Sequence, residues 1–507
     1  MKTETRNLIA NYIGRGWVMA INLIATPLLI KILGIESYGL IGFYTTLYGL
    51  INLLDFGISP TINRELARYS VDQTQENRGR DLVRTLEIGY WIIGILLGVL
   101  VFFGAPIIAE KWLQSKNLSI DTLIHSIRLM GFLIVLEWPI TFYQGCLLGL
   151  QRHIRLNLIN IVNSLLKFGG ALLILTYVSP TIDTFFSWQL GVSTLQITLL
   201  VISVWLYLPA KQGNPVFDLK LLENIWKFAL SLNIISFLGL VISQIDQIFV
   251  SHNYNLEIFG FYNIALMINS GLSIVVSPIN LTYFPRFSAL VAQKDKDTFN
   301  RTYHQACQLV SAAVLPIATV GILFSRPIIL VWTGDPQVAD HASTITSIVL
   351  AGTLLNALIG IPYQAQVAHG WTRLALWSNV ICIPLVLLLV FLFNSIFGVT
   401  GVAAVRVVYG VIGLCIVIFI MYRYILIGEL KPWILNDILP SLLVCASFSL
   451  IKIAGDIFFP EIINTVPAFL FFSLAIQLVV IFSVRYTREK SLFFIQNIRN
   501  KYAKTIG

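Results

Sequence analysis

The residues best able to do chemistry in this chain are charged side chains inside long apolar stretches. We single out seven deep candidates: Arg15, Asp55, Glu137, Lys167, Asp246, Arg406 and Lys452. Inside a bilayer a charge costs several kcal/mol and normally faces a cavity or an opposite charge. We expect the cations Arg15, Lys167 and Arg406 to bind an anionic substrate. The carboxylates Asp55, Glu137 and Asp246 are expected to carry a coupling ion or to pair with these cations.

Two pairs are suggested by position. Arg15 and Asp55 fall in the same part of neighbouring stretches, and they either pair or place Arg15 in the cavity. Glu137 and Lys167 both lie near the middle of their stretches, so they are also expected to pair. The alternative for both pairs is an ion pair that only fixes helix packing.

The remaining charges have less specific interpretations. Asp246 and Lys452 lie near one end of their stretches, where a long side chain can extend toward water. Arg406 lies in the outer third of its stretch, and either a cavity or the membrane interface suits it.

The elements that position these residues are membrane-spanning helices. Of the 507 residues, 57% are hydrophobic and only 12% are charged, whereas a soluble protein carries about 25% charged residues. A spanning helix needs about 20 mostly apolar residues. About fourteen stretches qualify, near 8–33, 38–62, 86–108, 123–149, 156–177, 185–208, 226–250, 257–284, 303–325, 343–367, 374–396, 400–422, 436–458 and 464–484. The predicted fold class is an all-α integral membrane protein.

Basic residues orient these spans. With the N-terminus inside, 25 of the 34 Lys and Arg residues fall in inner segments and 5 in outer segments. Positive charges accumulate on the cytoplasmic side, so both termini are expected there. The net charge of +9 does not indicate nucleic-acid binding, because the basic residues sit in short loops.

The two halves of the chain repeat one another. Glu36–Gly39 recurs at Glu257–Gly260, and Tyr143-Gln144 recurs at Tyr363-Gln364. Six such matches keep an offset of 218 to 222 residues. Each copy holds six spans, so the copies enter the membrane from the same side and form two parallel lobes. We predict an N-lobe at 1–210, a C-lobe at 211–425, and two added helices with a basic tail at 426–507.

The deep charges are absent from the repeat. At the same offset Glu137 corresponds to Ala357, and Lys167 corresponds to Leu385. Scaffold features recur in both lobes, so charges found in one lobe are expected to serve function. No P-loop, nucleophile elbow, HExxH motif or metal-ligand spacing is present in the sequence. We therefore expect no cofactor, no metal and no enzymatic activity.

Several segments resemble Wzx-type polysaccharide flippases, which belong to the superfamily that includes the MATE drug exporters and the lipid II flippase MurJ. The segments are Leu33–Leu40, Leu53–Gly57, Arg64–Ala67, Gly149–Arg152, Gln244–Phe249 and Trp332–Gly334. The resemblance covers residues 8 to 485 and implies a central cavity between two six-helix lobes. It also implies that a cation in that cavity receives a pyrophosphate, and Arg15 matches best by its position on the first helix.

The activity implied by the resemblance is the flipping of an undecaprenyl-pyrophosphate-linked oligosaccharide by alternating access. The cargo is a repeat unit of O-antigen, capsule or exopolysaccharide, moved from the cytoplasmic to the periplasmic leaflet of a bacterial inner membrane. The implied partners are membrane lipid, H⁺ or Na⁺, a polysaccharide polymerase and a chain-length regulator.

Two other functions compete with this one. A cation-coupled multidrug exporter of the same superfamily would need an acidic, aromatic cavity, whereas the candidate residues here mix cations with carboxylates. A membrane glycosyltransferase or polymerase would need a large loop outside the membrane. The longest loop, after the second span, has about 24 residues and is basic.

Overall fold

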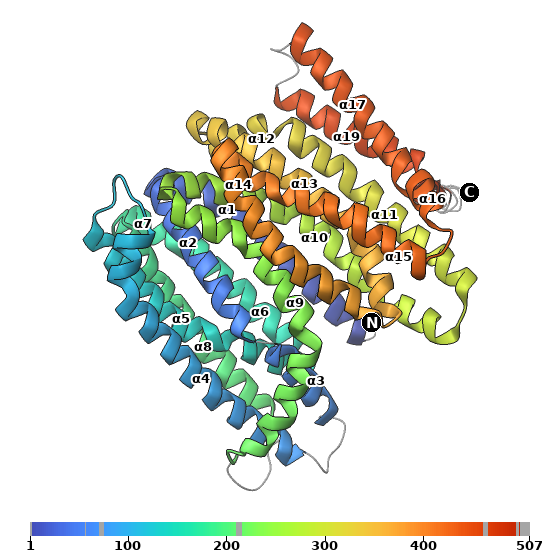
Figure 1. Cartoon of the computed structure of the whole chain (residues 1–507). Coiled ribbons are helices and arrows are strands. Elements are labelled where there is room, and N and C mark those ends of the chain that lie inside the picture. Colours follow the sequence, from blue (N-terminus) through green and yellow to red (C-terminus); the bar gives the residue numbers. More distant parts are fainter. Residues whose placement is uncertain are drawn as a thin grey trace, which may run out of the picture. The chain divides into compact units, whose positions relative to one another are not determined.

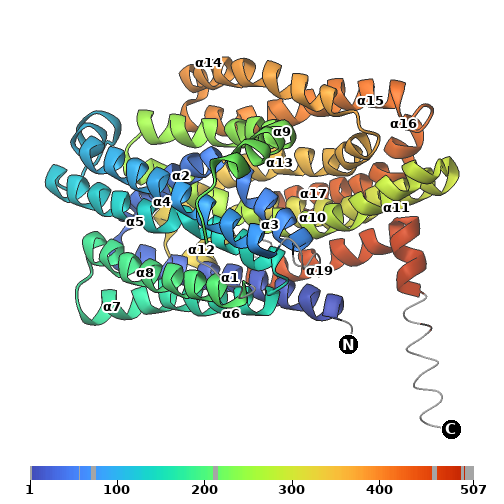
Figure 2. The ribbon, with the colours of Figure 1, turned by 90° about the horizontal axis from the view of Figure 1, so that it is seen from below.

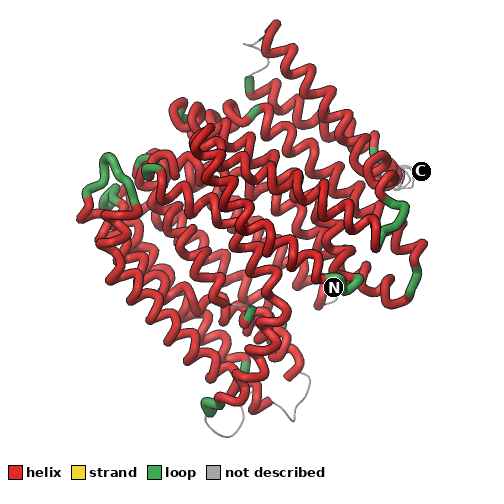
Figure 3. Tube along the Cα trace, viewed as in Figure 1, coloured by secondary structure: helices red, strands yellow, loops and turns green. Residues whose placement is uncertain are grey.

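The computed structural model describes residues 3–55, 57–69, 76–208, 215–459, 465–492 and 496. These residues form helices joined by short loops, with one isolated bridge between Gln114 and Asn255 (Figure 3). The predicted all-α class is confirmed. The chain divides into two compact units, Met1–Gly260 and Phe261–Gly507, and each is described by itself.

Unit 1 is built around α5. Its elements are α1 (Thr3–Leu33), α2 (Ile35–Asn52), η1 (Leu53–Asp55), α3 (Ile58–Tyr69), α4 (Glu76–Ile107), η3 (Ile108–Trp112), α5 (Ile120–Gly149), α6 (His153–Ser164), η4 (Leu165–Gly170), α7 (Ala171–Tyr177), α8 (Ile182–Tyr207), α9 (Leu219–Asn253) and the first turn of α10 (Leu256–Gln293). Helix α5 packs against α3, α4 and α8, and α4, α5 and α8 run side by side in Figures 1 and 2. Glycines allow the closest approach: a Cβ atom on Gly98 would lie 2.6 Å from the carbonyl oxygen of Gly131.

The two copies of the Glu-x-x-Gly motif meet where α2 and α10 begin. A Cβ atom on Gly260 would lie 2.6 Å from the carbonyl oxygen of Ile35, and one on Gly39 would overlap the Leu256 carbonyl group. Both positions therefore need glycine, because any side chain would push the two helix ends apart.

One loop binds the acidic residues of both copies. The backbone N–H groups of Lys116 and Asn117 donate to the Glu36 carboxylate at 2.6 and 3.0 Å. The Lys116 ammonium lies 2.9 Å from the carboxylate of Glu257. Equivalent residues of the two copies are thus held by the same short segment after η3.

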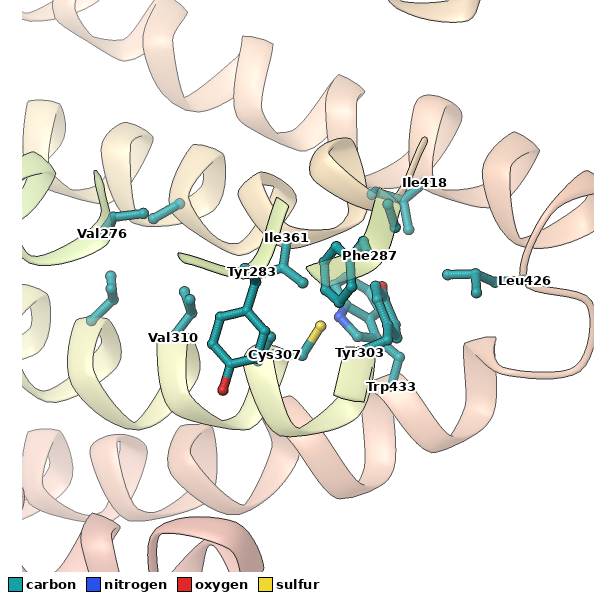
Figure 4. Close-up of a cluster of buried hydrophobic side chains, with 14 of the residues drawn as sticks. Val276, Tyr283, Phe287, Tyr303, Cys307, Val310, Ile361, Ile418, Leu426 and Trp433 are labelled. Atoms are coloured by element: carbon teal, nitrogen blue, oxygen red, sulfur yellow. The ribbon is translucent and has the colours of Figure 1, made fainter. Parts of the chain in front are cut away.

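Unit 2 is built around α11. Its elements are the rest of α10, α11 (Lys296–Leu323), α12 (Ser325–Thr333), α13 (Pro336–Ala368), α14 (Thr372–Ile412), η5 (Gly413–Ile418), α15 (Phe419–Tyr424), α16 (Leu430–Pro432), η6 (Trp433–Ile438), α17 (Leu439–Phe458) and α19 (Val466–Ser483). Helix α11 packs against α13, α17 and α19. Figure 4 shows part of the core, where Phe287 of α10, Tyr303 and Cys307 of α11, and Trp433 of η6 are buried together.

Helix α19 is bonded to a carbonyl group that a proline in α11 leaves free. Pro316 has no N–H group, so the carbonyl of Ala312, four residues earlier, loses its helical partner. The Gln477 side chain of α19 donates to that carbonyl at 3.3 Å. Helix α19, the second of the two helices outside the repeat, is thus bonded to α11 at this proline.

The chain reverses direction inside α14. Gly398 has φ 62°, which a helix interior does not accommodate. A Cβ atom on Gly401 would overlap the carbonyl group of Phe393. In a straight helix residues eight positions apart are separated by about 12 Å, so α14 consists of two helices joined by a tight turn.

This turn bears on the number of spans. Among the described residues, 11 helices are long and apolar enough to cross a membrane, or up to 13 if each bent pair is one span. One of these candidates, Thr372–Tyr424, contains the reversal at Gly398 and therefore comprises two shorter helices. A multi-pass membrane protein is confirmed, and the total of fourteen stays a prediction.

The division into compact units differs from the predicted lobes by one helix. Helix α9 was assigned by the repeat to the C-lobe at 211–425, yet it packs against α2, α3 and α4 of unit 1. The lobes are defined by sequence similarity, whereas the units are defined by packing. The units therefore do not test the predicted lobe boundary at residue 210, which stays a prediction.

Candidate functional site

The candidate site in unit 1 is a buried ion pair at the middle of α5. The Lys167 ammonium contacts the Glu137 carboxylate, and the side chain of Glu137 is 7% exposed. The carboxylate also accepts hydrogen bonds from the Tyr44 hydroxyl at 2.7 Å and from the Ser193 hydroxyl at 2.8 Å. The predicted pairing of Glu137 with Lys167 is confirmed, whereas their roles in transport stay predictions.

Four elements supply this site. Glu137 comes from α5, Lys167 from η4, Tyr44 from α2 and Ser193 from α8. The Tyr48 hydroxyl, one turn beyond Tyr44 on α2, donates to the backbone carbonyl of Glu137 at 3.2 Å. Polar groups from α2 and α8 therefore hold the acidic residue from two sides.

Electrostatics explains why the carboxylate has so many partners. Removing an ion pair from water costs several kcal/mol for each ion, and the attraction offsets this only if the remaining lone pairs are also bonded. Tyr44 and Ser193 provide such bonds to Glu137. The Lys167 side chain is 21% exposed, so the lysine is the more accessible member of the pair.

Lys167 lies in a π-helical turn rather than in regular α-helix. The turn η4 spans Leu165–Gly170. Two side chains of α8 bond to its carbonyl groups: Trp188 donates to Leu166 at 2.8 Å, and Gln189 donates to Lys167 at 2.9 Å. Turns of this kind are frequent at functional sites.

A second polar cluster surrounds Asp55, where α2 ends. Its carboxylate accepts from the Ser59 hydroxyl at 2.7 Å and from the Tyr90 hydroxyl. The chain bends by 51° here, between Ile35–Asp55 and Ile58–Tyr69. The side chain of Arg15 lies outside the described residues, so the predicted Arg15–Asp55 pair stays a prediction.

The other predicted residues belong to other elements. Asp246 is 5% exposed on α9. Lys452 contacts Asp456 and lies 5.4 Å from the centre of the Phe324 ring. Both side chains are buried, and the snorkelling alternative stays a prediction. Arg406 packs against Gly352 in unit 2, and its role in substrate binding stays a prediction.

A charged network in unit 2 was not predicted. His304 of α11 lies between two carboxylates, with ring nitrogens 2.5 Å from Asp437 and 3.1 Å from Glu429. The Asp437 side chain is fully buried and also accepts from Gln308 at 2.9 Å. No group of three or more His, Cys, Asp or Glu residues that could hold a metal is present within the described ranges.

Comparison with known proteins agrees with this architecture. Residues 5–291 match the family described as Polysaccharide biosynthesis protein, and residues 232–392 match the MatE family. A Shigella flexneri protein, whose name proposes a role as an O-antigen transporter, is 22% identical over 401 residues. That alignment covers 78% of this chain and 93% of the relative.

Solved structures show the same fold. The lipid II flippase MurJ, in an inward closed conformation, has a TM-score of 0.71 at 15% identity and covers 97% of this chain and 100% of its own. An inward-facing MATE multidrug resistance transporter has a TM-score of 0.65 at 13% identity and covers 80% of this chain and 96% of its own.

Proposed function

Because the chain belongs to the polysaccharide biosynthesis protein family, a group of flippases related to the MATE transporters and MurJ, we propose that it flips a lipid-linked oligosaccharide. The cargo is an undecaprenyl-pyrophosphate-linked repeat unit of O-antigen, capsule or exopolysaccharide. It moves from the cytoplasmic to the periplasmic leaflet of a bacterial inner membrane, with both termini of the protein in the cytoplasm. The observation that carries this proposal is the buried Glu137–Lys167 pair.

The chemistry of the cargo suits a fixed cation. Sugars and a pyrophosphate lose their hydration in hydrocarbon, and the charged group makes that loss very costly. Lys167 can replace part of this hydration once it leaves Glu137. Arg15 and Arg406 are the further cations that we assign to the pyrophosphate.

The same pair offers a way to couple the cargo to an ion. With no cargo the two charges cancel each other. When the Lys167 ammonium binds a phosphate instead, the buried Glu137 carboxylate has no opposite charge beside it, which is strongly unfavourable. A proton or a sodium ion removes that penalty, so cargo and ion bind together. Asp55 and Asp246 are assigned supporting roles as charge partners.

Flipping alone does not set the direction, because both leaflets present the same lipid. Net movement needs an ion gradient or removal of the product. In our proposal a polysaccharide polymerase with its chain-length regulator consumes the lipid-linked unit on the periplasmic side.

A multidrug exporter remains the alternative, and the MatE match at residues 232–392 favours it within the same superfamily. A site for a cationic drug would leave Glu137 available for the ligand. Here Lys167 occupies that carboxylate, which opposes a cation and suits an anion.

The test uses the organism of origin with its copy of the gene deleted. The deletion should abolish surface polysaccharide and accumulate lipid-linked oligosaccharide in the cytoplasmic leaflet. The wild-type gene should restore both, and Lys167→Ala should restore neither at equal protein level. The control is Arg326→Ala, which alters a half-exposed ion pair and should complement fully. Normal surface polysaccharide in the deletion strain, with increased sensitivity to cationic drugs, would overturn the proposal in favour of export.

A further inference from the structure

We propose that Trp188 and Gln189 are positioning residues, which keep η4 in its π form and thereby hold Lys167 on Glu137. Relaxation of this turn to α geometry is then the step that frees the lysine. The inference rests on the proposed function for the purpose of the released lysine, but the release itself is a property of unit 1 that can be measured without any cargo.

The backbone of η4 explains why outside donors are needed. In an α-helix the Ala171 N–H group would donate to the carbonyl of Lys167, four residues earlier. In this chain that N–H group donates to Phe168 instead. The carbonyl of Lys167 is bonded by Gln189 of α8, and the neighbouring carbonyl of Leu166 is bonded by Trp188.

Packing restricts the turn in the same way. The Trp188 ring lies so close to Gly170 that a Cβ atom there would be 2.5 Å from the ring atom Cζ2. Gly169 and Gly170 end the turn, and consecutive glycines weaken regular helix. The sequence of η4 therefore admits the π form, and the two side chains of α8 select it.

Helix α8 contacts both members of the ion pair. Gln189 donates to the backbone of Lys167, while Ser193, one helical turn later on α8, donates to the Glu137 carboxylate. A displacement of α8 therefore acts on the lysine and on its partner at once. Tyr44 of α2 stays with Glu137 when the lysine leaves, because it bonds to the other carboxylate oxygen.

The size of the effect follows from the bonds that select the π form. A neutral hydrogen bond shifts an equilibrium by up to about tenfold. Without the Gln189 donor the π form loses one of its bonds, whereas the α arrangement gives the Lys167 carbonyl a partner in the Ala171 N–H group. Gln189→Leu should therefore increase the released population of Lys167 by about tenfold.

The experiment measures the reactivity of Lys167 in purified, detergent-solubilised protein. An amine-acetylating reagent is applied for increasing times, and peptide mass spectrometry gives the rate of modification at each lysine. Gln189→Leu and Trp188→Phe should each accelerate modification of Lys167, toward the rate set by Glu137→Gln, in which the partner charge is absent. The rate at Lys116, in the segment between η3 and α5, should stay constant, which excludes general unfolding.

The matched control is Gln196→Leu, the same substitution at another buried glutamine of α8, seven residues farther along. It should leave the rate at Lys167 unchanged. Equal rates in wild type, Gln189→Leu and Trp188→Phe would overturn the inference. If Gln189→Leu does not fold, Trp188→Phe decides alone, because it removes a donor while keeping an aromatic ring. Faster labelling with unchanged flipping would uphold the positioning role and contradict the proposed use of Lys167.

Discussion

Removing one charge of the Glu137–Lys167 pair, and then both, separates a transport role from a packing role. Glu137→Gln leaves the ammonium unpaired, and Lys167→Met leaves the carboxylate unpaired. Breaking a buried pair in this way costs about 3–5 kcal/mol. We expect values near 3 kcal/mol for each, because Lys167 is 21% exposed and Glu137 keeps the Tyr44 and Ser193 donors.

The double variant should be more stable than either single variant. With both charges removed no unpaired ion is buried, and such replacements are often close to neutral. We expect a loss of about 1 kcal/mol, so the effects of the two substitutions should be far from additive. Apparent melting temperatures of the purified proteins, measured by size-exclusion after heating, provide the comparison.

Flipping should respond differently from stability. All three variants should fail to restore surface polysaccharide, although the double variant folds nearly as well as the wild type. A pair that only fixes helix packing would instead regain flipping in the double variant. Normal complementation by Glu137→Gln/Lys167→Met would thus refute the role of the pair, and additive losses of stability would refute its energetics.

Two further predictions concern stability. His304→Ala removes the ring that bonds the buried Asp437 carboxylate and the partly exposed Glu429 carboxylate, and it should cost about 3 kcal/mol. His125→Ala, which alters a His–Asp pair with a 59% exposed histidine, should cost at most about 1 kcal/mol. In thermal unfolding His304→Ala should lose more stability than His125→Ala. Equal losses in the two variants would contradict the importance assigned to the unit 2 network. Gly260→Ala forces a methyl group against the Ile35 carbonyl and should destabilise by about 2 kcal/mol. Gly191→Ala, where a Cβ atom meets nothing within 4 Å, should raise stability by about 0.5 kcal/mol; a change of the same sign in both would argue against the close approach.

The helices were predictable from local composition, and one ion pair was predictable from the depth of its two charges. Apolar runs of sufficient length must form helices in a bilayer, since every backbone polar group needs an internal partner. Glu137 and Lys167 were paired by their similar depth and the cost of an isolated charge, and the structure joins them. The break in α14 was also predictable, between the spans at 374–396 and 400–422.

The neutral partners of the pair were not predictable. Tyr44, Ser193 and Gln189 resemble many other polar residues of membrane helices, and only the packing of α2 and α8 against α5 selects them. The π turn depends on bonds from α8. In its own sequence only the Gly169-Gly170 pair indicates a departure from regular helix. His304 and Asp437 stand 133 residues apart, and no periodic pattern connects positions at that separation.

Helix α9 has a consequence for how the protein is made. It is the last complete helix of unit 1, and it packs on α2, α3 and α4, which are synthesised much earlier. Until residue 253 has been inserted, the parts of those helices that α9 covers have no protein partner there. Biogenesis of the first unit is therefore not finished when its sixth predicted span enters the membrane, and the nascent chain must reach into the second repeat to complete it.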